Sequence, residues 1–121
     1  MAVRYFVSNV DQSLAFYEKL GFSLVERWGP PFAIVEKDGL QLWLSGPQTS
    51  ASKPMLDGRV PGPGGWNRIV VSQANLLELY AELKEEGATF RNEPITGPGG
   101  TQVLLEDPDG NPIELFQARS E

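Results

Sequence analysis

The sequence predicts an α+β fold made of two copies of a β-α-β-β-β module, and three observations support this prediction. The triplet Val7-Ser8-Asn9 recurs as Val71-Ser72-Gln73, and each copy separates an apolar run from a helix-like stretch. Each helix-like stretch is followed by a glycine, Gly21 or Gly87, as expected at a left-handed helix C-terminus. Each half then continues with apolar runs that are separated by turn signals.

The two helices are expected at residues 10–20 and 74–86. Leu14, Tyr17 and Leu20 recur at helical spacing in the first stretch, and a matching apolar stripe runs along the second. Each helix therefore has one apolar side, which we expect to pack against the strands of its own module.

The remaining strands follow the helices in both halves. A strong hairpin signal, Asp38-Gly39, stands between two extended apolar runs of the first half. A second turn, Asp107-Pro108-Asp109-Gly110, stands between two runs of the second half, and residues 94–100 are expected to form a loop rich in proline and glycine. The expected strands are 24–28, 32–36 and 40–45 in the first half and 89–92, 102–106 and 113–117 in the second.

These elements divide the chain into module one at residues 1–45, a linker at 46–65 and module two at 66–121. The linker is rich in glycine and proline, which predicts neither strand nor helix there. A module of about 45–55 residues is too small to be stable alone, so we expect one domain over residues 1–121. Two four-stranded sheets, each with a helix on its outer face, would then enclose a cleft.

Composition excludes several classes of function. The 121 residues include no cysteine and no histidine, which excludes disulfides, thiolate nucleophiles, histidine-dependent triads and histidine-ligated metals. The net charge of −6 argues against nucleic-acid binding, because an acidic surface repels phosphate backbones. No apolar run approaches the ~18–20 residues that span a bilayer, and no signal peptide is visible. We therefore expect a cytoplasmic protein without a membrane partner.

Two segments resemble signatures of the vicinal oxygen chelate superfamily, which includes glyoxalase I, extradiol dioxygenases, fosfomycin-resistance enzymes and bleomycin-resistance proteins. Residues 7–22 are similar to its first helix signature, and residues 106–115, Glu-Asp-Pro-Asp-Gly-Asn-Pro-Ile-Glu-Leu, are similar to its last hairpin. The resemblance covers essentially the whole chain. It implies paired βαβββ modules that form a curved mixed sheet around a cavity. In the enzymes of the family, a divalent metal is held there by His or Gln and Glu side chains.

The resemblance also places the family's four metal-ligand positions, which lie on the first and last strands of each module. In this sequence they fall on Ala2, Trp43, Trp66 and Glu114. A slip of one residue, from Trp66 onto Asn67, supplies no histidine either. A catalytic metal needs about three suitable protein ligands, and one carboxylate remains here. We therefore expect no metal and no other cofactor, which argues against the metalloenzyme branches.

Strand alternation extends these four positions to a set of side chains on the cleft face. The leucines and isoleucines of the same strands then fall on the opposite face, as expected of a core. Flat aromatic walls with a few polar groups suit a planar or heteroaromatic ligand. The expected ligand-binding residues are Arg4, Phe6, Gln41, Trp43, Trp66, Arg68, Glu114 and Phe116.

This arrangement is similar to the bleomycin-resistance branch, in which a metal-free acidic dimer sequesters a drug in aromatic-lined grooves. The resemblance thus implies a homodimer that sequesters a small aromatic molecule, such as an antibiotic. The charge of that ligand stays open, because the net charge of −6 favours a cation whereas Arg4 and Arg68 favour an acid.

Two other functions remain alternatives. One is a metal-independent enzyme that uses Glu114 as acid or base and Arg68 or Arg4 to stabilise an oxyanion. The other is a ligandless interaction module, in which Trp43 and Trp66 fill the cavity and an arginine forms a structural ion pair with Glu114.

Overall fold

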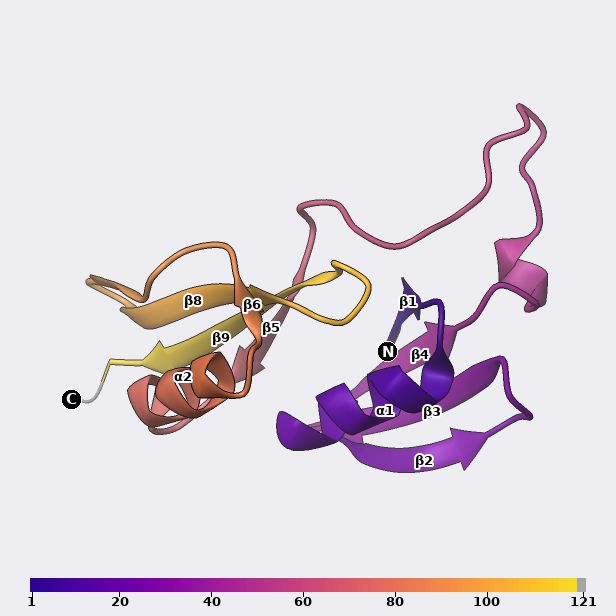
Figure 1. Ribbon diagram of the computed structural model, residues 1–121. Helices are drawn as coiled ribbons and strands as arrows, with labels where there is room; N and C mark the ends of the chain where they lie inside the picture. The colour runs from indigo at the N-terminus through magenta and orange to yellow at the C-terminus, as the bar shows by residue number, and fades with distance from the viewer. Residues whose placement is uncertain (120–121) are drawn as a thin grey trace. The chain divides into compact units, whose positions relative to one another are not determined.

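The computed structural model describes residues 1–119, which form two compact units that divide between Gly64 and Gly65. The boundary lies inside the predicted linker at residues 46–65. Each unit has its own sheet and its own helix, and each is described separately below (Figure 1). The expectation that both form one domain stays a prediction.

Unit 1 is a β-α-β-β-β module, as predicted. Its four-stranded sheet has the order β1-β4-β3-β2, in which β1 runs parallel to β4 and the other neighbours are antiparallel. Figure 1 shows α1 lying across β2, β3 and β4. The elements are β1 (Ala2–Phe6), α1 (Val10–Lys19), β2 (Ser23–Arg27), β3 (Phe32–Lys37) and β4 (Leu40–Ser45), followed by the 3₁₀ helix η1 (Ser50–Ser52).

Unit 2 repeats this topology with one additional strand. The order is β5-β9-β8-β6, with β5 parallel to β9, and β7 also pairs with β8. Both sheets are therefore mixed and open, which confirms the α+β fold class. The elements are β5 (Ile69–Ser72), α2 (Leu76–Glu85), β6 (Thr89–Phe90), β7 (Ile95–Gly97), β8 (Gly100–Glu106) and β9 (Pro112–Ala118).

Both helices end as the glycines predict. Gly21 has φ +95° and Gly87 has φ +92°, a conformation that glycine adopts without a Cβ clash. After α1, the N–H of Phe22 donates to the Tyr17 carbonyl at 3.1 Å, and the N–H of Gly21 donates to the Glu18 carbonyl at 3.0 Å. This pair of bonds is a Schellman motif, and α2 ends with the equivalent pair.

The two helices begin differently, although the repeat predicts the same start. Asn9 caps α1, since its Oδ1 accepts from the N–H of Gln12 at 2.9 Å. The helix α2 begins at Leu76 rather than at residue 74, after Asn75 in a left-handed conformation. The free N–H of Leu76 is satisfied from the sheet, because the Gln117 side chain on β9 accepts from it at 2.8 Å.

The core of each unit lies between its helix and one face of its sheet. In unit 1, Leu42 and Leu44 of β4 are fully buried, and Arg27 on the same sheet face reaches Asp11 of α1 at 2.6 Å. In unit 2, Ile113 and Leu115 of β9 are fully buried beneath α2. The predicted division of each strand into a core face and an opposite face is confirmed for these residues.

The hairpin at Asp38-Gly39 is confirmed as well. Asp38 has φ +51° and Gly39 has φ +83°, so both central residues take the left-handed conformation of a type I′ turn. The turn joins β3 to β4, which pair antiparallel from Phe32 with Ser45 to Lys37 with Leu40.

Two predictions in the second half are wrong. Residues 94–100 are not a plain loop, because Ile95–Gly97 forms β7, which pairs with β8 through a tight turn at Pro98 and Gly99. The strand expected at residues 89–92 ends at Phe90. The Asn92 side chain accepts from the N–H of Leu104 at 2.9 Å and so replaces the next backbone pair.

The linker also differs from the prediction, since η1 (Ser50–Ser52) is a short helix inside it. The Ser52 hydroxyl donates to the Gly46 carbonyl at 2.6 Å and anchors this turn against the end of β4. Further along, the backbone N–H and the Nε of Arg59 both donate to the Asp57 carboxylate, which lowers the pKa of that carboxyl.

The first strand of unit 2 begins at Ile69, so Trp66 and Arg68 precede it, whereas the resemblance places Trp66 on that strand. In the parallel register Ile69 stands opposite Ile113, and one residue earlier the partner would be Pro112. Proline has no N–H to donate to a ladder, and the pairing ends there. No helix within residues 1–119 is long and apolar enough to cross a membrane.

Gly100, at the start of β8, lies where the β7–β8 turn packs closely against β9. Its φ is +148°, and a Cβ there would collide with the carbonyl oxygen of Gln117 on β9. We expect Gly100→Ala to destabilise the protein by about 1–3 kcal/mol, measured as a shift of the urea unfolding midpoint. The control is Gly99→Ala, where a Cβ would meet nothing within 4 Å. Equal midpoints for the two variants would contradict this packing.

Candidate functional site

The face of the unit 1 sheet opposite α1 carries four of the predicted site residues. Arg4 of β1 stands opposite Trp43 of β4, and Gln41 and Phe6 lie two positions along their own strands. Because strand side chains alternate between faces, these four residues share one face. We call it the open face of unit 1. Phe32, Ile34 and Ser45 lie on the same face, since Trp43 stands opposite Ile34 and Ser45 opposite Phe32.

Arg4 lies among aromatic rings on this face. Its guanidinium carbon is 5.1 Å from the ring centroid of Trp43 and 6.0 Å from that of Phe32. The two rings meet edge to face, with their centroids 6.2 Å apart. One guanidinium nitrogen, Nη1, also donates to the hydroxyl of Ser45 at 2.9 Å. Cation–π contacts of this kind hold a guanidinium over a ring while leaving N–H groups free for a ligand.

Trp43 is itself fixed within the strand. Its Nε1 donates to Oε1 of Gln41 at 3.2 Å, two positions back along β4. Half-buried Trp43 thus presents part of a flat ring whose orientation is set by a hydrogen bond, an edge contact and a cation. A ring held in this way provides a stacking surface at little cost in side-chain entropy.

Sequence reasoning gave no role to Trp28, which lies on the same face. A β-bulge between Leu24 and Glu26 shifts the register of β2, so that Glu26 stands opposite Ile34. Beyond β2, the N–H of Trp28 donates to the Phe32 carbonyl at 2.9 Å. The indole Nε1 of Trp28 donates to Glu26 at 2.8 Å, and 67% of this residue is exposed. Trp28 therefore adds a second exposed indole to the open face of unit 1.

A small pocket lies at the end of this face, where the linker passes over β1 and β4. Its volume is about 150 Å³, and it includes Phe6 and the fully buried Ser45 that accepts from Arg4. The linker side of the pocket is apolar. The lining residues are Phe6, Val7, Ser8, Ser45, Gly46, Pro47, Ser52, Val60, Pro61, Gly62 and Pro63.

In unit 2 the predicted residues Arg68, Glu114 and Phe116 lie on the sheet face opposite α2. Nε of Arg68 lies 3.1 Å from Oε1 of Glu114, whose exposed fraction is 8%. The ion pair that the sequence left open for Arg68 is therefore present, whereas Arg4 has other partners. Leu104 stands opposite Glu114 on β8, so the carboxylate lies beside an apolar neighbour and is held by Arg68.

Trp66 is held by an arginine that sequence reasoning missed. The guanidinium of Arg91 lies 4.5 Å from the Trp66 ring centroid, and its Nε donates to Glu106 at 2.8 Å. Its other two nitrogens donate to the carbonyls of Gly65 and Gly110 at 2.9 and 3.0 Å. Trp66 is 71% exposed, so it does not fill a cavity in unit 2.

The four positions that the resemblance assigns to a metal do not fit one. Ala2 has no donor atom, and the indole nitrogens of Trp43 and Trp66 are hydrogen-bond donors without a lone pair to give. The remaining carboxylate, that of Glu114, is engaged by Arg68. Within residues 1–119 no group of three side chains of ligand type could hold a metal ion.

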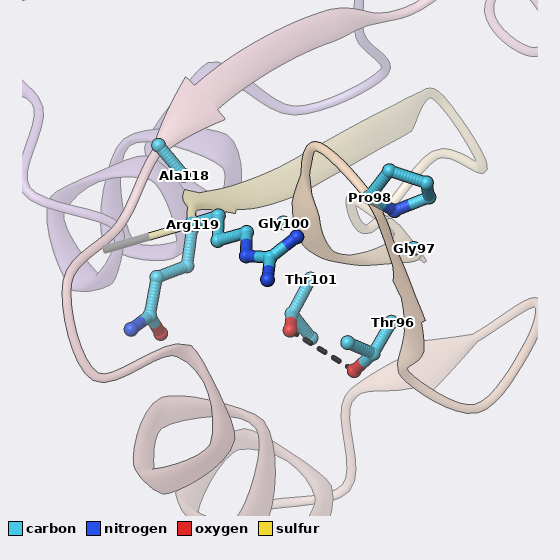
Figure 2. A pocket seen from close by; sticks show the side chains of 8 residues that line it. Thr96, Gly97, Pro98, Gly100, Thr101, Ala118 and Arg119 are labelled. Carbon is cyan, nitrogen blue, oxygen red and sulfur yellow. Dashed lines mark hydrogen bonds between the residues drawn. The ribbon is translucent and has the colours of Figure 1, made fainter. Parts of the chain in front are cut away.

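A pocket of about 670 Å³ lies elsewhere in unit 2, beside the β7–β8 turn (Figure 2). Its lining combines glycines and a proline with Thr96 and Thr101, whose hydroxyls are 3.1 Å apart, and with Arg119. None of the predicted site residues lines it. Since no aromatic side chain lines it, we place the candidate site on the open face of unit 1.

Comparison with known proteins assigns the family. The family model described as the Glyoxalase/Bleomycin resistance protein/Dioxygenase superfamily matches residues 2–115. The chain belongs to this superfamily. The resemblance of residues 7–22 and 106–115 is thereby confirmed, and the superfamily's mixed α+β fold is the one described above.

Similar proteins match nearly the whole chain. YurT, an uncharacterized protein of Bacillus subtilis, is 31% identical over 120 residues, with 93% of both chains covered. A superfamily member from Sphaerobacter thermophilus of known crystal structure is 31% identical, with 96% of this chain and 94% of that chain covered and a TM-score of 0.74. TnmS3, an antibiotic-binding protein from Streptomyces sp. CB03234, is 26% identical, with 98% and 93% covered and a TM-score of 0.74.

The hydrogen bonds and ring contact of Arg91, which we call the Arg91 network, are expected to stabilise the fold of unit 2. Lysine keeps the charge but does not reproduce the fork that bonds Glu106, Gly65 and Gly110 together. We expect Arg91→Lys to lower the free energy of unfolding by about 1–2 kcal/mol in urea titrations. Arg59→Lys is the control, because the Arg59 side chain is 87% exposed and its loss is expected to matter by less than about 0.5 kcal/mol. A variant Arg91→Lys as stable as the control would show that the network does not anchor this end of unit 2.

Proposed function

We propose that this protein binds and sequesters a planar aromatic small molecule, such as an antibiotic, without a metal ion. The observation that carries the proposal is the group of aromatic rings around the Arg4 guanidinium on the open face of unit 1. Trp43, Phe32 and Arg4 form one contact cluster, and Trp28 extends it. Single exposed aromatic side chains are common on surfaces, but a ring cluster around a guanidinium is a surface on which a flat molecule can stack.

Two further findings support the proposal. The positions that hold a metal in enzymes of the superfamily are occupied by Ala2, Trp43, Trp66 and Glu114, whose chemistry does not suit one. TnmS3, which is similar over 98% of this chain, is an antibiotic-binding protein. Binding without chemistry needs no metal, so the two findings agree with each other.

The proposal includes the other predicted contacts, a homodimer and a cytoplasmic location. Phe6 and Gln41 lie on the open face of unit 1, and Phe116 and the Arg68–Glu114 pair lie on the corresponding face of unit 2. Trp66 is exposed beside Arg91, where its ring is also accessible to a ligand. We assign no catalytic role to Glu114, because its carboxylate is already engaged by Arg68.

Tryptophan fluorescence tests the binding surface. Bleomycin, doxorubicin and nalidixate span a cationic glycopeptide, a flat polycyclic antibiotic and a heteroaromatic carboxylate. We expect saturable quenching by at least one of the three and a loss of affinity of about tenfold or more in Trp43→Ala, measured by calorimetry. Trp66→Phe measures the contribution of unit 2, and Leu77→Ala, exposed on α2, is the control. The absence of binding by all three compounds to folded protein would overturn sequestration.

Sedimentation tests the dimer. A homodimer has twice the 13.3 kDa mass of one chain, and we expect that mass at micromolar concentration. Exposed apolar side chains such as Val70 on β5, at 54%, support association, because burying them removes apolar surface from water. We expect Val70→Lys to shift the equilibrium toward monomer, and Leu77→Lys on α2 is the matched control. A monomer at all concentrations would contradict the dimer.

A further inference from the structure

The arginines on the open face of unit 1 and on the unit 2 sheet face opposite α2 differ in which groups neutralise their charge. Arg68 is paired with Glu114 and Arg91 with Glu106. Within residues 1–119 no carboxylate lies within salt-bridge distance of the Arg4 guanidinium, whose contacts are two aromatic rings and the Ser45 hydroxyl. Within that part of the chain, its positive charge therefore has no counter-ion.

The other charged groups on this face do not reverse that conclusion. Glu26 lies across the sheet on β2 and accepts from the Trp28 indole at 2.8 Å. Glu36 stands opposite Gln41, which lies two residues along β4 from Trp43, the residue that Arg4 and Ile34 flank. The net charge of −6 acts at a distance, and at physiological salt it is screened over about 8 Å. Close to the guanidinium, the positive field of Arg4 therefore outweighs the net charge of the chain and favours an anionic ligand.

The surroundings of Arg4 also indicate which chemical group of the ligand carries its anionic group. The guanidinium is flanked by Trp43 and Phe32, and Ser45, which accepts from it, lines the pocket under residues 60–63. That pocket, of about 150 Å³, is comparable to an engineered apolar cavity that holds benzene. An anionic group and a flat ring thus find complementary sites next to each other.

We propose that the ligand of this face is an aromatic carboxylate, held with its carboxylate on the Arg4 guanidinium and its ring system against Trp43 and the pocket beside Phe6. The inference rests on the proposed function and specifies its ligand class. Guanidinium binds carboxylate through two parallel N–H groups, which a neutral or cationic analogue does not match. The charge of the ligand, which composition leaves open, is therefore negative.

Three probes with one ring system test the inference: 2-naphthoate, 2-naphthalenemethanol and 2-naphthylmethylamine, titrated by calorimetry. We expect 2-naphthoate to bind about tenfold more tightly than the alcohol, a difference of about 1.4 kcal/mol, and the amine to bind most weakly. This preference is expected to decrease at high salt. Arg4→Gln should remove the preference while the affinity for the alcohol changes little. Arg4→Lys should keep part of it.

Arg59→Gln is the matched control, because Arg59 is neutralised by Asp57 and lies outside the proposed contacts, so its loss should leave the preference for naphthoate intact. Arg68→Gln tests the alternative anion site on unit 2. Circular dichroism confirms that each variant is folded. If the alcohol binds as tightly as the naphthoate, the carboxylate inference is wrong and the proposed function stands. If none of the three probes binds, the carboxylate inference is wrong, and the antibiotic panel decides separately whether the proposed function stands. If Arg68→Gln rather than Arg4→Gln removes the preference, the anion site is not on unit 1.

Discussion

Each helix buries one face of its own sheet, and the chemistry of the opposite face depends on this packing. Leu42 and Leu44 on β4 are fully buried under α1, as are Ile113 and Leu115 on β9 under α2. Because strand side chains alternate, the residues between them must face away from the helix. A slip of one residue would bury arginine and expose leucine. Burial of the core side chains therefore fixes the strand register, and the register fixes which side chains form the site.

On the open faces the same residue type serves different purposes, depending on its neighbours. Arg91 ties Trp66 to Glu106 and to two backbone carbonyls, which makes it a structural residue. Arg68 and Glu114 neutralise each other. Arg4 is held by aromatic rings and by a neutral hydroxyl, which is why we propose that its charge serves a ligand. A guanidinium is always ionised, and its partners alone decide its role.

Membership of the superfamily accounts for the fold, whereas function follows from the site. The resemblance implies that the enzymes of the superfamily hold a metal with His or Gln and Glu side chains of this module. In this chain Trp43 occupies one of those strand positions, and its ring meets Phe32 and Arg4. In the function that we propose, this change of side chain replaces metal coordination by stacking.

The sequence by itself determined the repeat, both helices with their glycine caps, the Asp38-Gly39 hairpin and the shared face of Arg4 and Trp43, because these follow from local conformation and alternation. Tertiary structure decided what depends on distant partners. Pro112 on β9 ends the pairing before Arg68, and Gln117 caps α2 from another strand. The bulge at β2 turns Trp28 onto the open face, where alternation counted from Leu24 would put it in the core. Pairing register is a property of two strands, so one strand's pattern cannot reveal it.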